Sequence, residues 1–204
     1  FFGFLVHIYS LGSKIVVLGI VIDLGALVAY KYLGFLVENL LVSGTTHHGI
    51  VFARKFADMF RVTLRNVTVE RSGLENPECA DIHALSRFWF DNPPGNIVFD
   101  NVKTVGQWRY NADGIDICGC EDVVVRNSFI RSFDDSFVVR DGGISSDKGA
   151  YQPARNIRCE NTILWCDWGY NVKTQLTGRR GALIEGITVT NCYAVVLFKC
   201  IEVI

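Results

Sequence analysis

Methionine and proline are scarce in this sequence, which contains one Met and four Pro among 204 residues. Phe, Val and Ile are abundant instead, and aromatic and β-branched residues favour strands over helices. No stretch shows the heptad or 3.6-residue periodicity that would predict a coiled coil or an amphipathic helix. Half of the residues are hydrophobic, so the composition predicts an all-β protein with enough apolar residues for a sizeable core.

A surplus of charge of either sign is also missing. The 20 basic and 21 acidic side chains leave a formal net charge of −1. This balance provides neither a basic surface for nucleic acid nor an acidic tail. We therefore expect no nucleic-acid partner, and we expect a monomer.

The seven cysteines lack the paired Cys-x-x-Cys spacing of a zinc site, and their odd number excludes a complete internal disulfide framework. Cys118, Cys159 and Cys192 lie in apolar, strand-like runs, where buried free thiols are expected. His47 and His83 lack partners at a matched spacing. The sequence thus predicts no metal site and no cofactor.

A long hydrophobic run is missing as well. Residues 1–42 are hydrophobic, yet the apolar stretch Ile15–Ala29 is shorter than the ~20 residues of a membrane span. The start of the chain lacks the basic region and small-residue cleavage site of a signal peptide. Residues 1–42 could be degenerate first coils of a solenoid, a hydrophobic cap or anchor, or sequence outside the domain. We favour the first, because Lys14–Leu24 and Gly34–Val42 are rich in strand formers and punctuated by Gly, and we expect no membrane partner.

Five strand-like runs recur along the chain, each with an Asn in the middle. The runs are Val62–Val69, Ile97–Thr104, Val123–Ile130, Ile157–Leu164 and Ile187–Ala194, with Asn66, Asn101, Asn127, Asn161 and Asn191 at their centres. Spacings of 35, 26, 34 and 30 residues are typical of a solenoid with loop insertions. An Asn can adopt the left-handed conformation that a corner needs, and its amide can bond to the Asn of the next coil.

Second strand candidates lie between these runs, at Gly114–Ile117, Ser136–Arg140 and Tyr170–Lys173. Hairpin turns of the Asn-Gly or Asp-Gly type, which a β-sandwich would use, are largely missing. The repeat therefore predicts a parallel β-helix that occupies residues 1–204 as one domain. Because the chain begins with Phe, this domain could be a truncated one.

Three carboxylates occur at a spacing of about one coil. Asp113 lies in NADGIDI (Asn111–Ile117), and 21 residues later Asp134 begins the Asp134–Asp135 pair of SFDDSFVVR. Such a spacing places Asp113 and Asp134 on neighbouring rungs of a β-helix. Asp135 would share their cleft only if the chain bends there, because successive strand residues face opposite ways. Crowded carboxylates raise the pKa of at least one member, which provides the acid and the base of glycoside hydrolysis.

The NADGID and DD segments resemble the N-[TS]-D-G-x-[DN] and D-D motifs of glycoside hydrolase family 28, the polygalacturonases and their relatives. The resemblance covers roughly residues 60–200. It implies a right-handed parallel β-helix, a carbohydrate polymer or oligosaccharide substrate, and an extracellular or periplasmic location. It also implies an inverting hydrolase, in which Asp135 resembles the general acid while Asp113 and Asp134 resemble the pair that activates water. An inverting acid and base are expected ~6.5–9.5 Å apart.

Two further motifs of that family, G-H-G and R-I-K, are missing. The next coil reads WCDWGYNVKT (Trp165–Thr174), and the nearest basic stretch is Val195–Lys199. Because the Arg and Lys of R-I-K hold the uronate carboxylate in that family, their absence argues against galacturonan and favours neutral sugars or an unusual polysaccharide, unless part of the motif lies beyond the end of this sequence. When Asp134 is aligned with Asp167, Trp168 lies near the family's His and Lys173 lies opposite Arg140.

This alignment predicts that Asp167 either extends the acidic floor of the cleft or caps a turn. Aromatic rings suit stacking on sugar faces, although they could equally fill the core. Arg140 and Lys173 could contact sugar hydroxyls or a carboxylate, or be exposed charges at strand ends. The candidate substrate-binding residues are Tyr110, Asn111, Arg140, Asp167, Trp168 and Lys173.

Two other functions share this fold. A non-catalytic carbohydrate-binding or structural β-helix could keep the motifs without a working cleft. A polysaccharide lyase would use the carboxylates to hold Ca²⁺, with Arg140 or Lys173 as the base.

Overall fold

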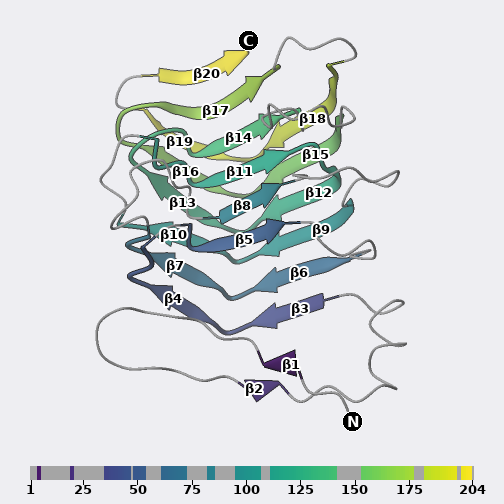
Figure 1. The fold of residues 1–204 in the computed structure, drawn as a ribbon. Helices are drawn as coiled ribbons and strands as arrows, with labels where there is room; N and C mark the ends of the chain where they lie inside the picture. Colours follow the sequence, from purple (N-terminus) through teal and green to yellow (C-terminus); the bar gives the residue numbers. More distant parts are fainter. Residues whose placement is uncertain are drawn as a thin grey trace.

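The chain forms a solenoid of stacked strands (Figure 1). The computed structural model describes residues 4–5, 19–20, 35–46, 48–53, 61–72, 82–85, 95–106, 111–141, 153–176, 182–196 and 199–203. These residues contain strands and turns and no helix, so none of them forms a helix that could cross a membrane. The prediction of an all-β protein is confirmed.

Three parallel sheets, each of six strands, make up the solenoid. The first contains β3 (Phe35–Glu38), β6 (Val62–Arg65), β9 (Gly95–Asp100), β12 (Glu121–Arg126), β15 (Ala154–Glu160) and β18 (Ile184–Thr190). The second contains β4 (Leu41–Ser43), β7 (Thr68–Glu70), β10 (Lys103–Val105), β13 (Phe129–Ser132), β16 (Ile163–Cys166) and β19 (Tyr193–Val196). The third contains β5 (Ile50–Ala53), β8 (Ile82–Leu85), β11 (Ile115–Cys118), β14 (Phe137–Arg140), β17 (Tyr170–Gln175) and β20 (Lys199–Val203).

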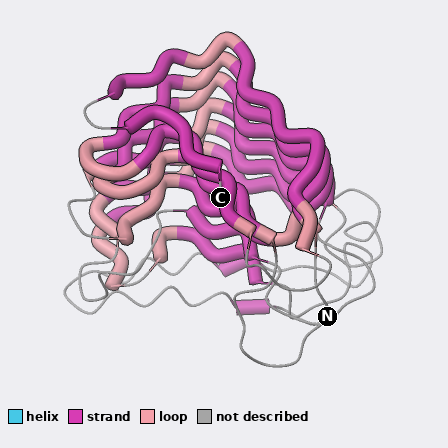
Figure 2. The backbone as a smooth tube through the Cα atoms, turned by 90° about the horizontal axis from the view of Figure 1, so that it is seen from above, coloured by secondary structure: helices cyan, strands magenta, loops and turns pink. Residues whose placement is uncertain are grey.

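Neighbours in each sheet are three strands apart in the chain, so one strand from each sheet in turn forms a coil. Seen along its axis, the molecule shows the strands of successive coils lying over one another (Figure 2). This arrangement confirms the predicted parallel β-helix.

Part of the hydrophobic N-terminal segment belongs to this stack. Strands β3 and β4 pair in parallel with β6 and β7, as expected if Gly34–Val42 contributes to a first coil. The short strands β1 (Phe4–Leu5) and β2 (Gly19–Ile20) pair antiparallel. Most of Lys14–Leu24 lies outside the described residues.

In most strands of the first sheet, every second residue points into the interior. On β12, Val123 and Val125 are fully buried, and Val124 between them is partly exposed. Their partners in the next strand down the stack, Ile97 and Phe99 on β9, are buried in the same way. Identical alternation in successive coils produces continuous apolar columns, and this burial is the main stabilising contribution to the fold.

The central Asn of each repeat forms the corner between the first and second sheets. Positive φ angles occur at Asn39, Asn66, Asn101, Asn127, Asn161 and Asn191. Hydrogen bonds between side-chain amides link several of these residues in neighbouring coils. Asn101 Nδ2, for example, donates to Asn66 Oδ1 at 2.7 Å. The predicted ladder is therefore confirmed between Asn66 and Asn101 and between Asn161 and Asn191, with Asn39 as an additional member. Asn127 donates instead to Asp100 Oδ1.

Asn101→Ala is expected to lower the free energy of unfolding by about 1–2 kcal/mol, because alanine disfavours the left-handed conformation and loses the bond to Asn66. Urea unfolding measures the change. Asn101→Gly is the matched control, because glycine keeps the backbone conformation and loses only the bond. Equal losses in both variants would contradict the conformational part of this prediction.

The six cysteines among the described residues are free, and most of them are buried, as expected. Cys118, Cys120, Cys159 and Cys166 are buried. Cys192, predicted to be buried, is only partly so, because it follows β18 in the last described coil, where the strand is largely exposed.

Candidate active site

The three carboxylates lie where the chain enters the third sheet. Asp113 precedes β11, and Asp134 and Asp135 lie in the bend between β13 and β14. The Asp134 N–H donates to the Ala112 carbonyl (3.2 Å) and the Gly114 N–H to the Asp135 carbonyl (2.8 Å). Residues 133–136 have no strand conformation, so consecutive side chains can both serve one site. The spacing of one coil and the bend required by Asp135 are both present.

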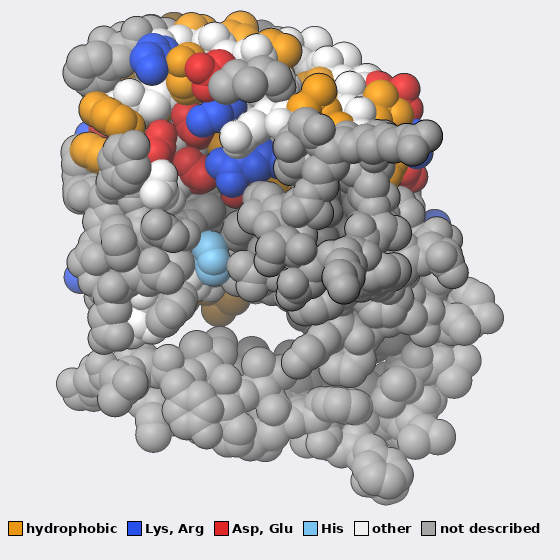
Figure 3. Space-filling view, turned by 45° about the horizontal axis from the view of Figure 1, so that its top comes forward, with side chains coloured by type: hydrophobic (Ala, Val, Ile, Leu, Met, Phe, Trp, Pro, Cys, Tyr) orange, Lys and Arg blue, Asp and Glu red, His pale blue; other side chains and the backbone are white. Residues whose placement is uncertain are grey.

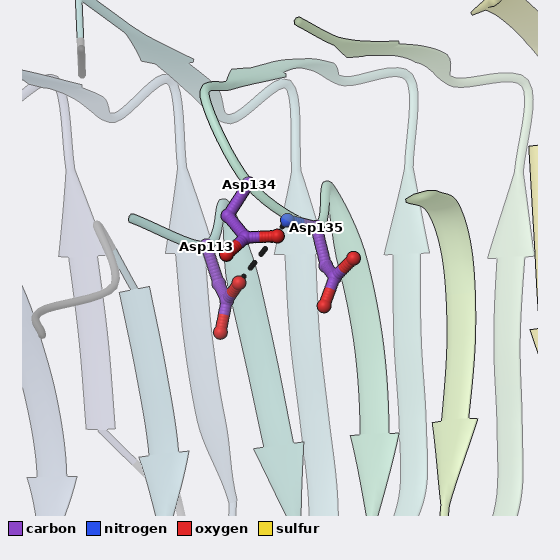
Figure 4. Close-up of side chains that lie close together, drawn as sticks. All are labelled: Asp113, Asp134 and Asp135. Carbon is purple, nitrogen blue, oxygen red and sulfur yellow. Dashed lines mark hydrogen bonds between the residues drawn. The ribbon is translucent and has the colours of Figure 1, made fainter. Parts of the chain in front are cut away.

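The three side chains lie side by side (Figure 4). One oxygen of each carboxyl group lies within 4.8 Å of one oxygen of both others. All three residues are buried, with exposed fractions of 6%, 9% and 2% for Asp113, Asp134 and Asp135. The distances within 4.8 Å join one oxygen of each group, so the expected separation of ~6.5–9.5 Å between the acid and the base stays a prediction.

Each of the three carboxylates accepts a hydrogen bond from a backbone N–H group. The Asp135 N–H donates to Asp113 Oδ1 (3.1 Å), and the Asn111 N–H donates to Asp134 Oδ2 (3.1 Å). Gly169 lies against the pair from the next coil, and a Cβ added there would collide with the Asp134 and Asp135 carboxyl oxygens. The carboxylates are therefore packed by backbone on two sides.

Arg140 neutralises the buried side of the cluster. Its Nη2 lies 3.2 Å from Asp113 Oδ2, and its Nη1 lies 3.0 Å from Asp116 Oδ2. Arg140 does not line the cleft, so its contacts position carboxylates. Asp116, the last residue of the NADGID segment, was not singled out by the sequence analysis, although the motif contains it.

Lys173 contacts the carboxylate of Asp135. Its Nζ lies 2.9 Å from Asp135 Oδ2, and the Tyr170 N–H donates to Asp135 Oδ1 (2.8 Å). The sheet pairs Lys173 with Val138, so the predicted position opposite Arg140 is wrong. Asp135 is consequently the carboxylate that carries an ion pair facing the cleft.

Burial and repulsion by neighbouring carboxylates shift the pKa of Asp113 and of Asp134. The pKa of Asp113 is raised well above its ordinary value, first by burial and then by the Asp116 charge, while Arg140 opposes the shift. The pKa of Asp134 is raised by burial and by the Asp135 charge, against the hydrogen bond from the Asn111 backbone. Both groups therefore keep a proton at a higher pH than a free Asp does.

Asp113→Asn is expected to stabilise the fold at neutral pH. Because burial raises the folded-state pKa of Asp113, its contribution to stability is full below its ordinary value of 3.8 and is lost as pH rises toward the folded value. Asn cannot ionise, so the variant avoids this loss of stability at high pH. Its Tm should therefore exceed that of the wild type by ~2–4 °C at neutral pH and by less at pH 4. Thermal unfolding at several pH values measures the difference, and a difference that does not grow with pH would contradict the prediction.

A cleft of about 380 Å³ opens beside the carboxylates. Its lining residues are Asn111, Asp134, Asp135, Trp168, Gly169, Tyr170, Lys173, Lys199 and Glu202. Trp168 is 44% exposed and stacks on Phe133 with a centroid separation of 6.2 Å. In the view of Figure 3, acidic and basic side chains are interleaved near the C-terminal end of the solenoid.

Asp167 lies outside this lining. Arg131 donates to it through Nε (3.0 Å) and Nη2 (3.2 Å), and Trp165 Nε1 donates at 3.0 Å. The pairing of Ser132 with Cys166 places Asp167 beside Phe133, so the predicted column of Asp113, Asp134 and Asp167 is displaced by one residue.

The structure thus brings Asn111, Trp168 and Lys173 to one cleft with Asp134 and Asp135. Tyr110 lies outside the described residues. Tyr170, Lys199 and Glu202 also line this cleft and were not predicted from the sequence. Charged residues beside apolar ones in KCIEV were the available signal, but their place in the cleft depends on the register of β20.

Comparison with known proteins adds one similarity in sequence. No family model matches this chain, and no solved structure matches it. A polygalacturonase from Brassica napus is 30% identical over 132 residues, which is 62% of this chain. The matched region spans 30% of the length of that relative. With the parallel β-helix, this similarity indicates a polygalacturonase-like fold.

Proposed function

We propose that this chain carries the active site of a glycoside hydrolase that acts on a carbohydrate polymer or oligosaccharide. The observation that supports this proposal is the pairing of two adjacent carboxyl groups in different environments beside one cleft. Asp134 has a raised pKa, and Asp135 is ion-paired with Lys173. Glycoside hydrolysis needs one carboxylic acid and one carboxylate near the scissile bond. The similarity to a polygalacturonase supports the same proposal, and with it an extracellular location.

In this proposal Asp134 is the general acid. It faces the cleft and can keep the proton that the leaving oxygen needs. Asp135 is the general base, because the Lys173 ammonium stabilises it as an anion. This assignment replaces the one implied by the motif, in which Asp135 is the acid. Asp113 helps to position Asp135, because its carboxylate accepts a hydrogen bond from the Asp135 backbone N–H.

The substrate would lie along the exposed face of Trp168, whose ring can stack on a sugar. The Asn111 side chain, beside Asp134 at the cleft, would bond to sugar hydroxyls. The implied outcome is inversion at the anomeric carbon, with water held by Asp135. In a retaining enzyme, whose two carboxyl groups lie ~5–5.5 Å apart, Asp135 would instead be the nucleophile.

Incubation with a panel of neutral and acidic polysaccharides, with and without EDTA, tests the proposal. Release of reducing ends that EDTA does not inhibit is expected. The anomer that NMR detects first in the product assigns the mechanism, since the opposite anomer from the substrate means inversion. If a folded protein releases no reducing ends from any member of a broad panel, the chain is a binding or structural β-helix.

A Ca²⁺-dependent lyase is the rival enzyme, since the three carboxylates could hold a metal ion. The basic residues do not favour it. A lyase base must be neutral, whereas the pKa of Lys173 is raised by its bond to Asp135 against the opposing effect of burial. Arg140 is likewise ion-paired, with Asp113 and Asp116. Unsaturated products that absorb in the ultraviolet, lost on EDTA treatment, would identify a lyase.

A further inference from the structure

Both ammonium groups of the cleft are held by other side chains that line it. Lys173 Nζ lies between Asp135 Oδ2 (2.9 Å) and Glu202 Oε2 (3.6 Å). The Tyr170 hydroxyl donates to Glu202 Oε1 (2.5 Å), and Lys199 Nζ lies 4.6 Å from the centre of the Tyr170 ring. These contacts form a chain that begins at Asp135 and ends at Lys199.

Glu202 decides the charge balance of the cleft. The lining described above holds three carboxyl groups, Asp134, Asp135 and Glu202, and two ammonium groups, Lys173 and Lys199. The cleft is therefore neutral when Asp134 keeps its proton and carries one negative charge when it does not. Without Glu202, Lys173 would balance Asp135 alone and Lys199 would leave a surplus positive charge.

The position of Glu202 is fixed by the sheet. Strand β20 pairs with β17 so that Glu202 lies directly opposite Lys173, one coil further along the solenoid. The Glu202 side chain is 24% exposed, so it can meet a ligand while it contacts Lys173. An anionic ligand in this cleft would meet a carboxylate and find the nearest ammonium already engaged, and unfavourable like-charge contacts discriminate strongly between ligands.

We propose that Glu202 is a specificity-determining residue that makes the cleft select neutral sugars and reject uronic acids. The inference rests on the proposed glycosidase function and narrows its substrate class. Glu202 acts by neutralising Lys173 and by placing its own charge where a sugar carboxylate would lie. Its oxygens remain able to accept hydrogen bonds from sugar hydroxyls.

Two trisaccharides that differ only at C6 provide the test: α-1,4-linked galactotriose, which is neutral, and trigalacturonate, which carries a carboxylate on each sugar. Binding is followed by the change in Trp fluorescence on titration, because Trp168 lines the cleft. The full chain is compared with Glu202→Gln. The matched control is Glu185→Gln, which removes the same charge from an exposed residue paired with Arg155 and outside the cleft lining.

The wild type should bind galactotriose more tightly than trigalacturonate. Glu202→Gln should strengthen trigalacturonate binding by about tenfold and change galactotriose binding by less than about twofold, whereas Glu185→Gln should change neither. Added salt should improve trigalacturonate binding to the wild type, because screening weakens repulsion.

Tighter binding of trigalacturonate than galactotriose by the wild type would overturn the inference. So would a Glu202→Gln variant that gains no affinity for trigalacturonate, whether or not either sugar binds the wild type. These outcomes are independent of catalysis. Failure of the proposed hydrolase would show instead as absence of released reducing ends, with the charge selectivity of binding intact.

Discussion

Asp134→Asn should lower kcat by about 10²–10⁴-fold and leave KM nearly unchanged, because the substitution removes a proton donor and keeps the shape of the side chain. The amide oxygen of Asn can still accept the Asn111 N–H that now bonds to Asp134 Oδ2. Removal of a charge that burial disfavours should not destabilise the fold. Reducing-end release from the substrate found in the polysaccharide panel measures kcat and KM.

Substrates with different leaving groups can show which residue is the general acid and which is the general base. An aryl glycoside with a nitrophenol leaving group needs little protonation, so Asp134→Asn should lose much less activity on it than on the natural linkage. Asp135→Asn should lose activity on both substrates, because attack by water or by the carboxylate itself is impaired in each case. The reverse pattern would assign the acid to Asp135, as the resemblance to glycoside hydrolase family 28 implies.

A control for charge removal is Asp122→Asn. Asp122 is an exposed residue near the start of β12 with a φ of 54°; it accepts a hydrogen bond from Asn156, and Asn tolerates this conformation. The Asp122→Asn variant should be as active as the wild type. If Asp122→Asn lost as much activity as Asp134→Asn, the effect would arise from overall charge and the acid role of Asp134 would be rejected.

The fold was predictable because each coil repeats one local signal. An Asn such as Asn66 or Asn101 at a left-handed corner, flanked by alternating apolar residues, defines two strands without knowledge of the rest of the chain. The spacing of Asp113 and Asp134 then follows from the length of one coil. These features depend on short-range chemistry that recurs, so sequence alone reveals them.

The partners of the site were harder to predict because they depend on register. Phe137 lies five positions after Ser132, whereas Val172 lies six positions after Cys166, their partners in the next coil. The register of Ser132 with Cys166 already places Asp167 beside Phe133 and, if continued, would pair Lys173 with Val139. The extra residue, in the bend that contains Gly169, moves Lys173 one position further, to Val138. An irregular bend leaves no periodic signal, and a shift of one residue reverses the direction of every following side chain. Glu202 and Lys199 were missed for the same reason, since their neighbours come from other coils.

Phe137→Ala should destabilise the fold by about 3–5 kcal/mol, a large part of the total stability of an ordinary domain. Phe137 is fully buried on β14, between Ile115 on β11 and Val172 on β17. Alanine would leave a void between three successive coils, and a solenoid is stabilised mainly by contacts between neighbouring coils. Unfolding in urea, monitored by circular dichroism, measures the loss.

Tyr193→Ala removes a ring of similar size from β19, where Tyr193 is 69% exposed, and should change the free energy of unfolding by less than about 0.5 kcal/mol. Equal unfolding midpoints for the two variants would mean that Phe137 does not lie in the core.

The position of Phe137 also links the stability of the fold to the candidate active site, because Phe137 lies two residues after Asp135. A void there would loosen the bend that holds Asp134 and Asp135. Phe137→Ala should therefore lose activity at urea concentrations below its own unfolding transition, whereas Tyr193→Ala should not. Loss of activity only in step with global unfolding would show that the bend is held by its hydrogen bonds to Asp113 and Tyr170 without help from the core.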